Sequence, residues 1–515
     1  MYLTQSLHKT ARENPTRAAT IYAERTTTFS QLIDRVARLA SALRSHGVST
    51  GDRVGMLAMN SDRYIQYVYG TLWAGAVINP VNIRWSTAEI AYSINDCQTD
   101  VLLVDDAFAS VVGDLRERCP GLRTVIHCGD AETPSGMLDY EALIRTSEPI
   151  ADAIRCGDDL AAVLYTGGTT GAPKGVMLSH TNIASNVLSA LAATSRPDVE
   201  TVLQIAPFFH IGALSFVFQS MARLATQVIL PGFDAKAVIR DIARYRANEI
   251  FIVPTMLKMM LDEPSFAEHD LSSLKSIIYG ASPIDSSLLQ RAIVAIPSSQ
   301  FLQAYGMTET SPASAVLPAA CHVVGDPKLK AAGRPAPACE VRIVDPVTGE
   351  ECPPGSVGEV TVRGPGVMLG YWNKPEETAK ALRNGWMHTG DAGYMDADGY
   401  LYMTDRIKDM IISGGENIYS TEVENAILSH SAVQMCAVIG IPDEKWGEIV
   451  HAAVVLRPGQ ALTAEDLQTH CKQRIAGYKC PRSIEFRSEL PLSAAGKLLK
   501  FKLRETYWQS RDRQI

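Results

Sequence analysis

"YTGGTTGAPKG", residues 165–175, is the stretch from which the fold and the chemistry of this chain can be approached. It completes the apolar run "AAVLYT" (161–166), which predicts a buried strand. Glycines allow backbone N–H groups to turn toward one point, while the threonine hydroxyls and Lys174 add donors and a positive charge. The stretch therefore predicts an anion-binding loop. It is not a Walker loop, because Pro173 precedes Lys174 and Gly175 stands where that pattern requires Ser or Thr.

Length, charge and cysteine use restrict the class of protein. With 515 residues the chain is too long for one core, so two or three structural units are expected. The net charge of −8 argues against nucleic acid or an anionic membrane as a partner. The ten cysteines include no C-x-x-C pair, and the start "MYLTQSLHKTARENP" has no signal-peptide pattern. No uncharged apolar stretch is long enough to span a membrane, so we expect a cytoplasmic protein without an integral membrane segment.

Hydrophobic periodicity predicts an α/β fold followed by two smaller parts. Residues 30–47 have apolar side chains at steps of three and four, with Ser30 as the expected N-cap and Gly47 as the stop. Buried strands are expected at 52–58 and within 64–81, after a helix, and this alternation continues to about residue 330 with largely parallel strands. Turn-rich residues 339–372 predict a β-rich subdomain. The last hundred residues predict a small α+β C-terminal domain, with helices near 421–430 and 464–475 and strands at 434–440 and 451–456.

The opening stretch resembles the signature loop of the adenylate-forming superfamily, which has the common form Y-T-S-G-T-T-G-x-P-K-G. Here Gly167 takes the serine position. The other family signatures follow in order, and the resemblance spans essentially the whole chain, closest to the acyl-CoA synthetase branch. These signatures are "QAYGMTE" (303–309), "GEVTVRGPGVMLGYW" (358–372), "HTGD" (388–391), "TDRIKDMIISGGENI" (404–418) and "PLSAAGK" (491–497).

The resemblance implies a reaction in two steps and a division into two domains. A carboxylate and ATP would give an acyl adenylate and pyrophosphate, after which coenzyme A would take the acyl group as a thioester. ATP, Mg²⁺ and coenzyme A are the implied cofactors. The implied domains are an AMP-binding domain over 1–407 and a mobile C-terminal domain over 408–515, with the hinge at Lys408.

The same resemblance implies the residues around the nucleotide. Tyr305 would offer a ring to adenine, Thr308 a hydroxyl to the α-phosphate, and Asp391 a carboxylate to the ribose hydroxyls. Glu309, with Thr170, would hold Mg²⁺. Lys497 would reach the α-phosphate and substrate carboxylate, where a cation offsets the repulsion between two anions. The full ATP- or AMP-binding set is Thr166, Gly167, Gly168, Thr169, Thr170, Gly171, Lys174, Gly280, Ala281, Ser282, Gln303, Ala304, Tyr305, Gly306, Met307, Thr308, Asp391, Arg406 and Lys497.

Two further residue sets are implied for the acyl group and for coenzyme A. "APFFHIGALSF" (206–216) resembles the gate of the acyl pocket, where His210 would flank the carboxylate and join Lys497, Thr308 and Glu309 as a catalytic residue. A lone histidine beside aromatic rings is also a common core residue, and that reading stays open. The acyl set is Phe208, Phe209, His210, Gly212, Val253, Gly280 and Gly306. The coenzyme A set is Ser413, Gly414, Gly415, Glu416, Trp446 and Lys479, of which Trp446 and Lys479 could equally serve domain packing and solvation.

The substrate is the least constrained feature. The apolar segment at 251–256 and the small Gly212 favour a medium- or long-chain fatty acid, although a flat aryl or hydroxycinnamic acid would also enter. No Asp stands in "PFFH" to anchor an amino group, which disfavours an amino acid. Loading of a carrier protein, and a non-catalytic nucleotide-binding protein, are the remaining alternatives. Neither nucleic acid nor a membrane is expected as a partner, and the sequence leaves open whether the chain forms a homodimer.

Overall fold

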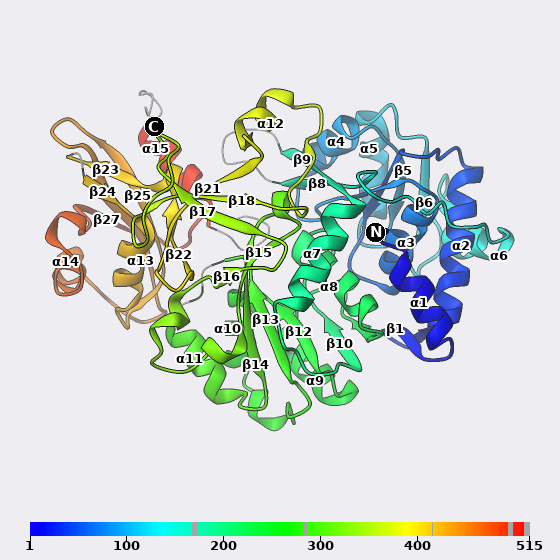
Figure 1. Ribbon diagram of the computed structural model, residues 1–515, viewed down its shortest axis with the longest axis horizontal. Helices are drawn as coiled ribbons and strands as arrows, with labels where there is room; N and C mark the ends of the chain where they lie inside the picture. Colours follow the sequence, from blue (N-terminus) through cyan, green and yellow to red (C-terminus); the bar gives the residue numbers. More distant parts are fainter. Residues whose placement is uncertain (167–172, 283, 285, 415, 493–497, 509–515) are drawn as a thin grey trace. The chain divides into compact units, whose positions relative to one another are not determined.

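A computed structural model describes residues 1–166, 173–282, 284, 286–414, 416–492 and 498–508 (Figure 1). The chain folds into two compact units. The first comprises the described residues up to 341 together with 362–387, and the second comprises 342–361 together with the described residues from 388 onward. The predicted hinge residue, Lys408, falls inside the second unit, and its side chain lies outside the described part.

The first unit contains an eight-stranded sheet in the order β19-β9-β8-β4-β3-β5-β6-β7. The strands from β8 to β7 in this order are parallel to one another, whereas β9 runs antiparallel to β8 and β19 antiparallel to β9. Their bounds are β3 Arg53–Leu57, β4 Val77–Pro80, β5 Thr99–Val104, β6 Thr124–His127, β7 Leu138–Asp139, β8 Leu160–Thr166, β9 Lys174–Ser179 and β19 Gly370–Tyr371.

A nine-stranded sheet of the same unit has the order β16-β15-β14-β13-β12-β10-β11-β1-β2. Its strands from β14 to β1 are parallel, and its outer strands β15, β16 and β2 are antiparallel to their neighbours. Their bounds are β1 Ala18–Tyr22, β2 Arg25–Thr28, β10 Thr201–Gln204, β11 Thr226–Ile229, β12 Glu249–Ile252, β13 Ser276–Gly280, β14 Gln300–Gly306, β15 Ala313–Leu317 and β16 Arg334–Pro335.

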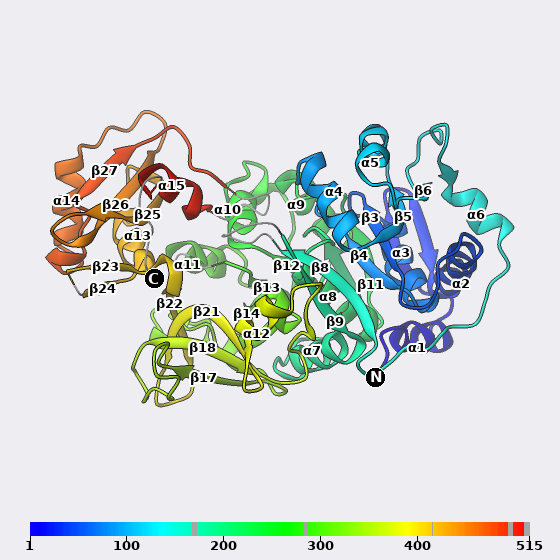
Figure 2. The same cartoon turned by 90° about the horizontal axis from the view of Figure 1, so that it is seen from above.

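Helices α3 and α7 lie between these two sheets. Each contacts strands of both: α3 contacts β3 and β1, and α7 contacts β9 and β15. Helix α3 (Asp62–Trp73) is buried along its whole length, and α7 (His180–Ala192) packs beside α8 (Ile211–Ala222), as both views show (Figures 1 and 2). The other helices of the unit are α1 Gln5–Glu13, α2 Phe29–Ser45, α4 Thr87–Asp96, α5 Val112–Arg118, α6 Tyr140–Thr146, α9 Ala235–Tyr245, α10 Pro254–Asp262, α11 Ser286–Ala295 and α12 Pro375–Ala381.

The second unit has two sheets and its own hydrophobic core. One sheet contains β17 (Glu340–Val344), β18 (Gly358–Arg363), β21 (Trp386–Met395) and β22 (Leu401–Arg406), while the short β20 (Leu382–Arg383) pairs with the start of β21. The other sheet has the order β24-β23-β26-β25, with β27 beside β26. Its elements are β23 Ile411–Ser413, β24 Glu416–Ile418, β25 Val433–Asp443, β26 Gly447–Leu456, β27 Ser483–Phe486 and the helices α13 Ser420–Leu428, α14 Ala464–Lys472 and α15 Lys500–Trp508.

The predicted elements are confirmed, and one predicted helix cap is wrong. Helix α2 is capped by Thr28 and not by Ser30, because Thr28 and Gln31 form a reciprocal capping box and the chain is already helical at Phe29. Gly47 does follow the helix in a left-handed conformation, with φ of +90°.

Two further features concern the surface and the thiols. Among the described helices, none is both long and apolar enough to cross a membrane. All ten cysteines lie in the described part and none forms a disulfide; Cys156 is exposed, Cys339 and Cys352 are half-buried, and the other seven are buried.

Candidate active site

The predicted nucleotide and acyl segments meet at one edge of the nine-stranded sheet. Strands β10, β12, β13 and β14 are parallel, so the segments that follow them leave the same edge. Those segments are 205–212, Val253, Ala281–Ser282 and Met307–Glu309. Strand β10 is flanked by β11 on one side and β12 on the other, so the connections diverge beside it. Such a topological switch point forms the crevice in which open α/β sheets bind ligands.

The loop of the opening stretch joins two antiparallel strands. Strand β8 ends at Thr166 and β9 begins at Lys174, and these two residues pair across the hairpin. The polypeptide therefore enters a strand after the glycines, whereas a Walker loop enters a helix. Residues 167–172, which include most of the predicted phosphate-binding set, lie outside the described part. The base of the hairpin is held by Tyr165, whose hydroxyl donates to Asp96 at 2.5 Å.

A polar chain of contacts links this hairpin to Glu309. The Glu309 carboxylate is buried, and its Oε1 accepts a hydrogen bond of 2.8 Å from the Tyr371 hydroxyl. Lys174 Nζ lies 5.1 Å from the centroid of the Tyr371 ring and 2.5 Å from Glu377 Oε2. The lysine lowers the pKa of Glu377 through that hydrogen bond, and burial beside Glu309 raises the pKa of Tyr371. Lys174 is thus held as a cation beside the tyrosine that orients Glu309.

The described residues fit a magnesium ion that is held mainly by phosphate oxygens. They contain no cluster of three or more His, Cys, Asp or Glu that could hold a metal by itself. Glu309 supplies a single buried carboxylate at the sheet edge, which is the donor set expected where Mg²⁺ is shared with substrate phosphates. Thr170, the second predicted ligand, lies outside the described residues.

The glycines at the ends of β13 and β14 are required by the strands themselves. A Cβ on Gly280 would lie 2.3 Å from the Ala304 carbonyl oxygen, and a Cβ on Gly306 would lie 1.6 Å from that of Pro312. Their small size therefore lets neighbouring strands approach. Any role in contacting adenine or the acyl group would fall to their backbone atoms.

The side chain of Gln303 is part of a buried polar relay. The Tyr279 hydroxyl lies 3.1 Å from Gln303 Oε1 and 3.0 Å from His322 Nε2, while His322 Nδ1 lies 3.0 Å from the Pro318 carbonyl oxygen. Burial lowers the pKa of His322 to about 4, so its imidazole is neutral at neutral pH. The Tyr279 hydroxyl therefore holds the Gln303 side chain, which stands at the start of the predicted adenine segment.

Three of the predicted acyl residues, Phe208, Phe209 and Gly212, lie against the rings of neighbouring residues. Phe208 is buried, and its ring meets Tyr64 edge-to-face with centroids 5.4 Å apart. The Phe209 ring lies at a tilt against the His210 ring, with centroids 4.2 Å apart, and His210 is the N-cap residue that precedes helix α8. Gly212 faces Phe251: a Cβ there would lie 3.0 Å from the edge of that ring. Phe251, which begins the predicted apolar segment 251–256 but is not among the named acyl residues, therefore borders Gly212.

In the second unit, Asp391 lies in strand β21, in a segment that Glu359 holds by hydrogen bonds. His388 Nδ1 lies 2.7 Å from Glu359 Oε2, and the Gly390 N–H donates to Glu359 Oε1 at 3.1 Å. Thr389 donates to the Val360 carbonyl at 2.7 Å, and Asp391 itself is buried. The first residues of "GEVTV" thus hold the "HTGD" segment of β21 in place. Arg406 pairs with Asp391 in the strand register, and its side chain lies outside the described part.

The predicted coenzyme A residues are partly brought together in the second unit. The Gly414 N–H donates to the Trp446 carbonyl at 2.8 Å, and a Cβ on Gly414 would lie 2.7 Å from the Trp446 ring. The Arg482 guanidinium lies over that ring at 4.4 Å, a contact that the sequence did not suggest. Ser413 is buried, Glu416 is exposed, and Gly415 lies outside the described residues.

Lys479 is engaged away from that tryptophan. Its Nζ lies 2.8 Å from both carboxylate oxygens of Glu422. Burial acts to lower the pKa of Lys479, but the hydrogen bond to Glu422 together with the charge of Glu422 and the neighbouring tyrosines outweighs it, and the pKa is raised. The predicted contact with coenzyme A would require the lysine to exchange this partner.

Residues 493–497, including the predicted catalytic Lys497, lie outside the described part, but the chain that follows is anchored. Lys500 Nζ lies 2.8 Å from Glu424 Oε1 and 2.5 Å from Ser420 Oγ, and all three side chains are largely buried. Ser420 in turn donates from its hydroxyl to Asp405 at 2.6 Å. This Asp405–Ser420–Lys500 network joins segments on the two sides of Lys408.

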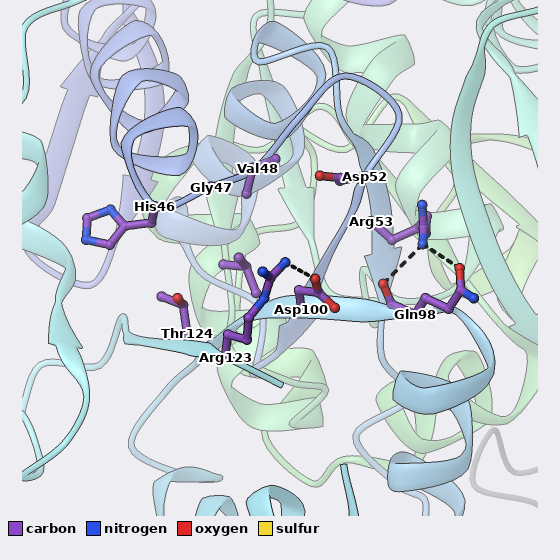
Figure 3. Close-up of a pocket in the computed structure, with 10 residues that line it drawn as sticks. His46, Gly47, Val48, Asp52, Arg53, Gln98, Asp100, Arg123 and Thr124 are labelled. Atoms are coloured by element: carbon purple, nitrogen blue, oxygen red, sulfur yellow. Dashed lines mark hydrogen bonds and ion pairs between the residues drawn. The ribbon is translucent and has the colours of Figure 1, made fainter. Parts of the chain in front are cut away.

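The first unit contains a cavity of about 280 Å³ beside the eight-stranded sheet, at the amino ends of its strands (Figure 3). Its lining residues stand at the amino ends of β3, β5 and β6. Arg53 is already engaged with the Cys97 carbonyl and both oxygens of Gln98, and Arg123 pairs with Asp100. Both guanidinium groups therefore have partners within the chain, and the cavity does not reproduce the anion site predicted from the glycine stretch.

Comparison with known proteins assigns the chain to a family. The model for the AMP-binding enzyme family matches residues 7–372, and that for the AMP-binding enzyme C-terminal domain matches residues 422–497. The chain is an AMP-binding enzyme. It belongs to the adenylate-forming superfamily and is an acid–thiol ligase of the ATP-dependent acyl-CoA and acyl-carrier group.

Individual relatives of this AMP-binding enzyme match along almost its whole length. It is 37% identical to the fatty acid–[acyl-carrier-protein] ligase ScoC of Streptomyces coeruleorubidus, over 99% of this chain and 97% of that protein. It is 38% identical to a feruloyl-CoA synthase of an Amycolatopsis species, over 96% and 97% of the two chains. The ATP-bound crystal structure of MatB from Rhodopseudomonas palustris superposes with a TM-score of 0.89 at 30% identity, covering 98% of this chain and 99% of that one.

Proposed function

We propose that this AMP-binding enzyme activates a medium- or long-chain fatty acid with ATP and transfers the acyl group to coenzyme A. The observation that carries the proposal is the apolar lining at the switch point beside β10. The described segments there, "IAPFFHIGALSF" (205–216) and "IFIVPTM" (250–256), contain no Asp or Glu that could anchor an amino group. Such a lining suits an acid whose body is hydrocarbon.

The proposed chemistry places the acid and the triphosphate at the same sheet edge. Glu309 would hold Mg²⁺, which when bound offsets charge on the phosphate oxygens. Thr308 would donate to the α-phosphate, His210 would flank the substrate carboxylate, and the 165–175 hairpin would hold the departing pyrophosphate. Lys497 would stabilise the charge that develops as carboxylate and phosphate meet. Asp391 and Arg406 would bind the ribose, and the Gly414–Trp446 pair would border the path of the coenzyme A thiol.

A second candidate substrate is an aryl or hydroxycinnamic acid. The Phe251 ring occupies the space beside Gly212 that the sequence suggested was open, so an aromatic side chain borders that position. A flat acid would stack against that ring, whereas a long chain would have to pass it. The feruloyl-CoA synthase relative is consistent with this candidate, and the ScoC relative is consistent with transfer to a carrier protein in place of coenzyme A.

A carboxylate panel tests these proposals. Pyrophosphate release would be measured with ATP, Mg²⁺ and fatty acids of graded length, or ferulate and benzoate, followed by consumption of coenzyme A. We expect the highest kcat/KM with a fatty acid of medium or long chain. A preference for ferulate would overturn the substrate proposal. Pyrophosphate release without loss of free coenzyme A thiol would indicate that a carrier protein, and not coenzyme A, accepts the acyl group.

The role of Lys497 is tested separately in the two steps. Lys497→Ala should lower the rate of adenylate formation about a thousandfold, because a unit charge pair near 4 Å contributes about 4 kcal/mol at an effective dielectric of 20. Thioester formation from supplied acyl adenylate should be largely retained. Equal loss of both steps would contradict the assignment.

A further inference from the structure

The two sheets of the first unit share the relative order of five parallel strands, β4-β3-β5-β6-β7 in one sheet and β11-β10-β12-β13-β14 in the other. In the nine-stranded sheet the switch point lies beside β10, which has β11 on one side and β12 on the other. In the eight-stranded sheet the equivalent strand is β3, flanked by β4 and β5. The segment leaving β3 contains Asn60, and this side chain reaches the segment leaving β10.

Asn60 grips the loop that carries the predicted acyl residues. Its Nδ2 donates to the Ala206 carbonyl at 2.9 Å, and its Oδ1 accepts from the Phe208 N–H at 2.9 Å. The two bonds bracket Pro207, a residue with no N–H of its own and a fixed φ. The Asn60 side chain is 3% exposed, so neither bond competes with water.

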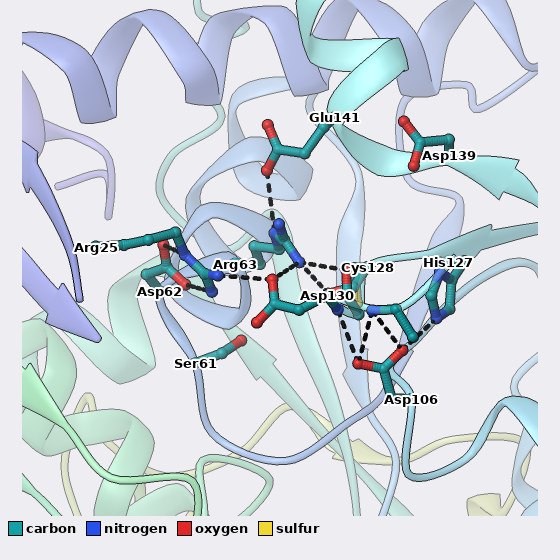
Figure 4. A network of polar contacts seen from close by, with 12 residues as sticks. Arg25, Ser61, Asp62, Arg63, Asp106, His127, Cys128, Asp130, Asp139 and Glu141 are labelled. Atoms are coloured by element: carbon teal, nitrogen blue, oxygen red, sulfur yellow. Dashed lines mark hydrogen bonds and ion pairs between the residues drawn. The ribbon is translucent and has the colours of Figure 1, made fainter. Parts of the chain in front are cut away.

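The clamp is itself held on both sides. Before Asn60, the Met59 N–H donates to Asp105 Oδ2 at 2.8 Å. After it, helix α3 begins with Asp62 and Arg63, which are buried in an ion-pair network at the carboxyl ends of β5 and β6 (Figure 4). Arg63 lies 2.9 Å from Asp130 and 3.0 Å from Glu141. This network anchors the start of α3, two residues after Asn60, to the segments that follow β5 and β6.

We propose that Asn60 is a positioning residue for the acyl-binding loop 206–210, setting the place of Phe209 and His210 against the carboxylic acid. Asn60 fixes the backbone at 206 and 208, and Tyr64, one turn into α3, meets the ring of Phe208. The next two residues are Phe209 and His210, and they can shift only if this clamp opens. The proposal rests on the proposed function, because it takes loop 206–210 as part of the acid site.

A buried asparagine that only stabilised the fold would give a different result. Asn79 provides the matched control, since it is fully buried in β4 of the same sheet and its Nδ2 donates to Thr99 Oγ1 at 2.9 Å. It has no bond to loop 206–210. Substituting either residue removes a buried amide, but only Asn60 should affect the acid.

The experiment compares Asn60→Ala, Asn60→Asp and Asn79→Ala in the full chain. Pyrophosphate release gives KM for the best acid of the panel and, separately, for ATP, and thermal unfolding gives stability. We expect Asn60→Ala to raise KM for the acid about tenfold, the effect of one or two lost buried hydrogen bonds, and to flatten the preference for chain length. KM for ATP should change less than about twofold, since the clamp does not reach the nucleotide segments.

The second variant keeps the test decisive if the first does not fold. Asn60→Asp keeps the shape and the acceptor for the Phe208 N–H but turns a carboxylate oxygen toward the Ala206 carbonyl. It should show the same rise in KM for the acid. If Asn79→Ala raises that KM as much, or if the Asn60 variants lose only thermal stability, the inference is wrong. If the wild-type chain itself releases no pyrophosphate with any acid, the proposed function fails first.

Discussion

Single residues at this site are positioned by partners that lie far away in the sequence. Glu309 and Tyr371 are 62 positions apart, and the hydrogen bond between them forms because β19 pairs with β9 and brings "LGYW" beside the turn at Thr308–Thr310. The sequence motifs supplied both residues, but no spacing or periodicity connects them. The same holds for Glu359 and His388. The sequence therefore names candidate site residues, whereas the contacts that orient them could not be predicted from it.

Tyr371→Phe tests the contact to Glu309. Loss of a hydrogen bond to a charged group typically costs about 1.5–3 kcal/mol, and here it would release the carboxylate proposed to hold Mg²⁺. We expect adenylate formation to slow at least about tenfold and to need more Mg²⁺ for half-maximal rate. Pyrophosphate release over a Mg²⁺ titration measures both.

Tyr140→Phe is the matched control for that variant. Tyr140 is also a buried tyrosine, and its hydroxyl donates a hydrogen bond of 2.8 Å to Gln66 Oε1. This bond does not involve Glu309 or its neighbours. The variant should leave the Mg²⁺ dependence unchanged. An unchanged titration for Tyr371→Phe would refute the positioning of Glu309 by Tyr371.

Two buried histidines should make the free energy of unfolding depend on pH in mildly acidic solution. Burial lowers the pKa of His322 and of His180 to about 4, while a histidine in the unfolded chain titrates near about 6.5. Between these values the unfolded state binds more protons, so this contribution to stability is complete above pH ~6.5 and is lost as pH falls toward ~4. Each histidine should contribute a slope of at most about 1.4 kcal/mol per pH unit.

His322→Gln should remove about one proton from that dependence. Urea unfolding of the wild type and the variant from pH 7.5 to 5 measures the slope. Asn79→Ala, which removes a buried side chain without a titratable group, serves as the control and should retain the wild-type slope. A His322→Gln slope equal to that of the wild type would show that this histidine is not held neutral.

At the scale of elements, the helices and strands were predictable but their ends were less so. The apolar pattern of residues 30–47 predicts α2, but the predicted cap, Ser30, is wrong. The capping box of Thr28 and Gln31 has the sequence pattern of a Thr with Gln three positions later, and "TFSQ" (28–31) contains that pattern. Fully buried α3 is a different case, because contact with both sheets, not its own periodicity, explains why polar Asp62, Arg63 and Gln66 are buried.

Thr28→Ala should destabilise the first unit. Removal of an N-cap side chain costs about 1 kcal/mol, since a backbone N–H at the helix start loses its acceptor. Ser30→Ala is the matched control, because Ser30 is exposed and already inside the helix. The urea midpoint should fall for the first variant and stay within error for the second. The reverse order would restore Ser30 as the cap.

At the scale of the whole molecule, the proposed rotation at Lys408 between adenylate formation and thioester formation would take place within the second unit. Asp405 precedes the proposed hinge at Lys408, whereas Ser420 and Lys500 follow it. Rotation of the chain about residue 408 would therefore separate Asp405 from Ser420. The sequence predicts a hinge at Lys408, but this contact between segments 15 positions apart required the structure.

Lys408→Pro tests the hinge. A proline fixes φ and removes the rotation that the second step would need. Adenylate formation should remain within about threefold of the wild type, while thioester formation should fall at least about a hundredfold. Lys408→Ala, which leaves φ free, should perform both steps. Loss of pyrophosphate release in the proline variant alone would contradict the assignment.

The burial of the thiols has a practical consequence for following such a rotation. Only Cys156 of the ten cysteines is exposed, and it lies in the first unit. Burial raises the pKa of Cys97 to about 12 and that of Cys339 to about 11, which keeps these groups as unreactive thiols. A maleimide dye should therefore attach to the native chain chiefly at one place. One introduced surface cysteine in the second unit would then complete a fluorescent pair without removing the other nine.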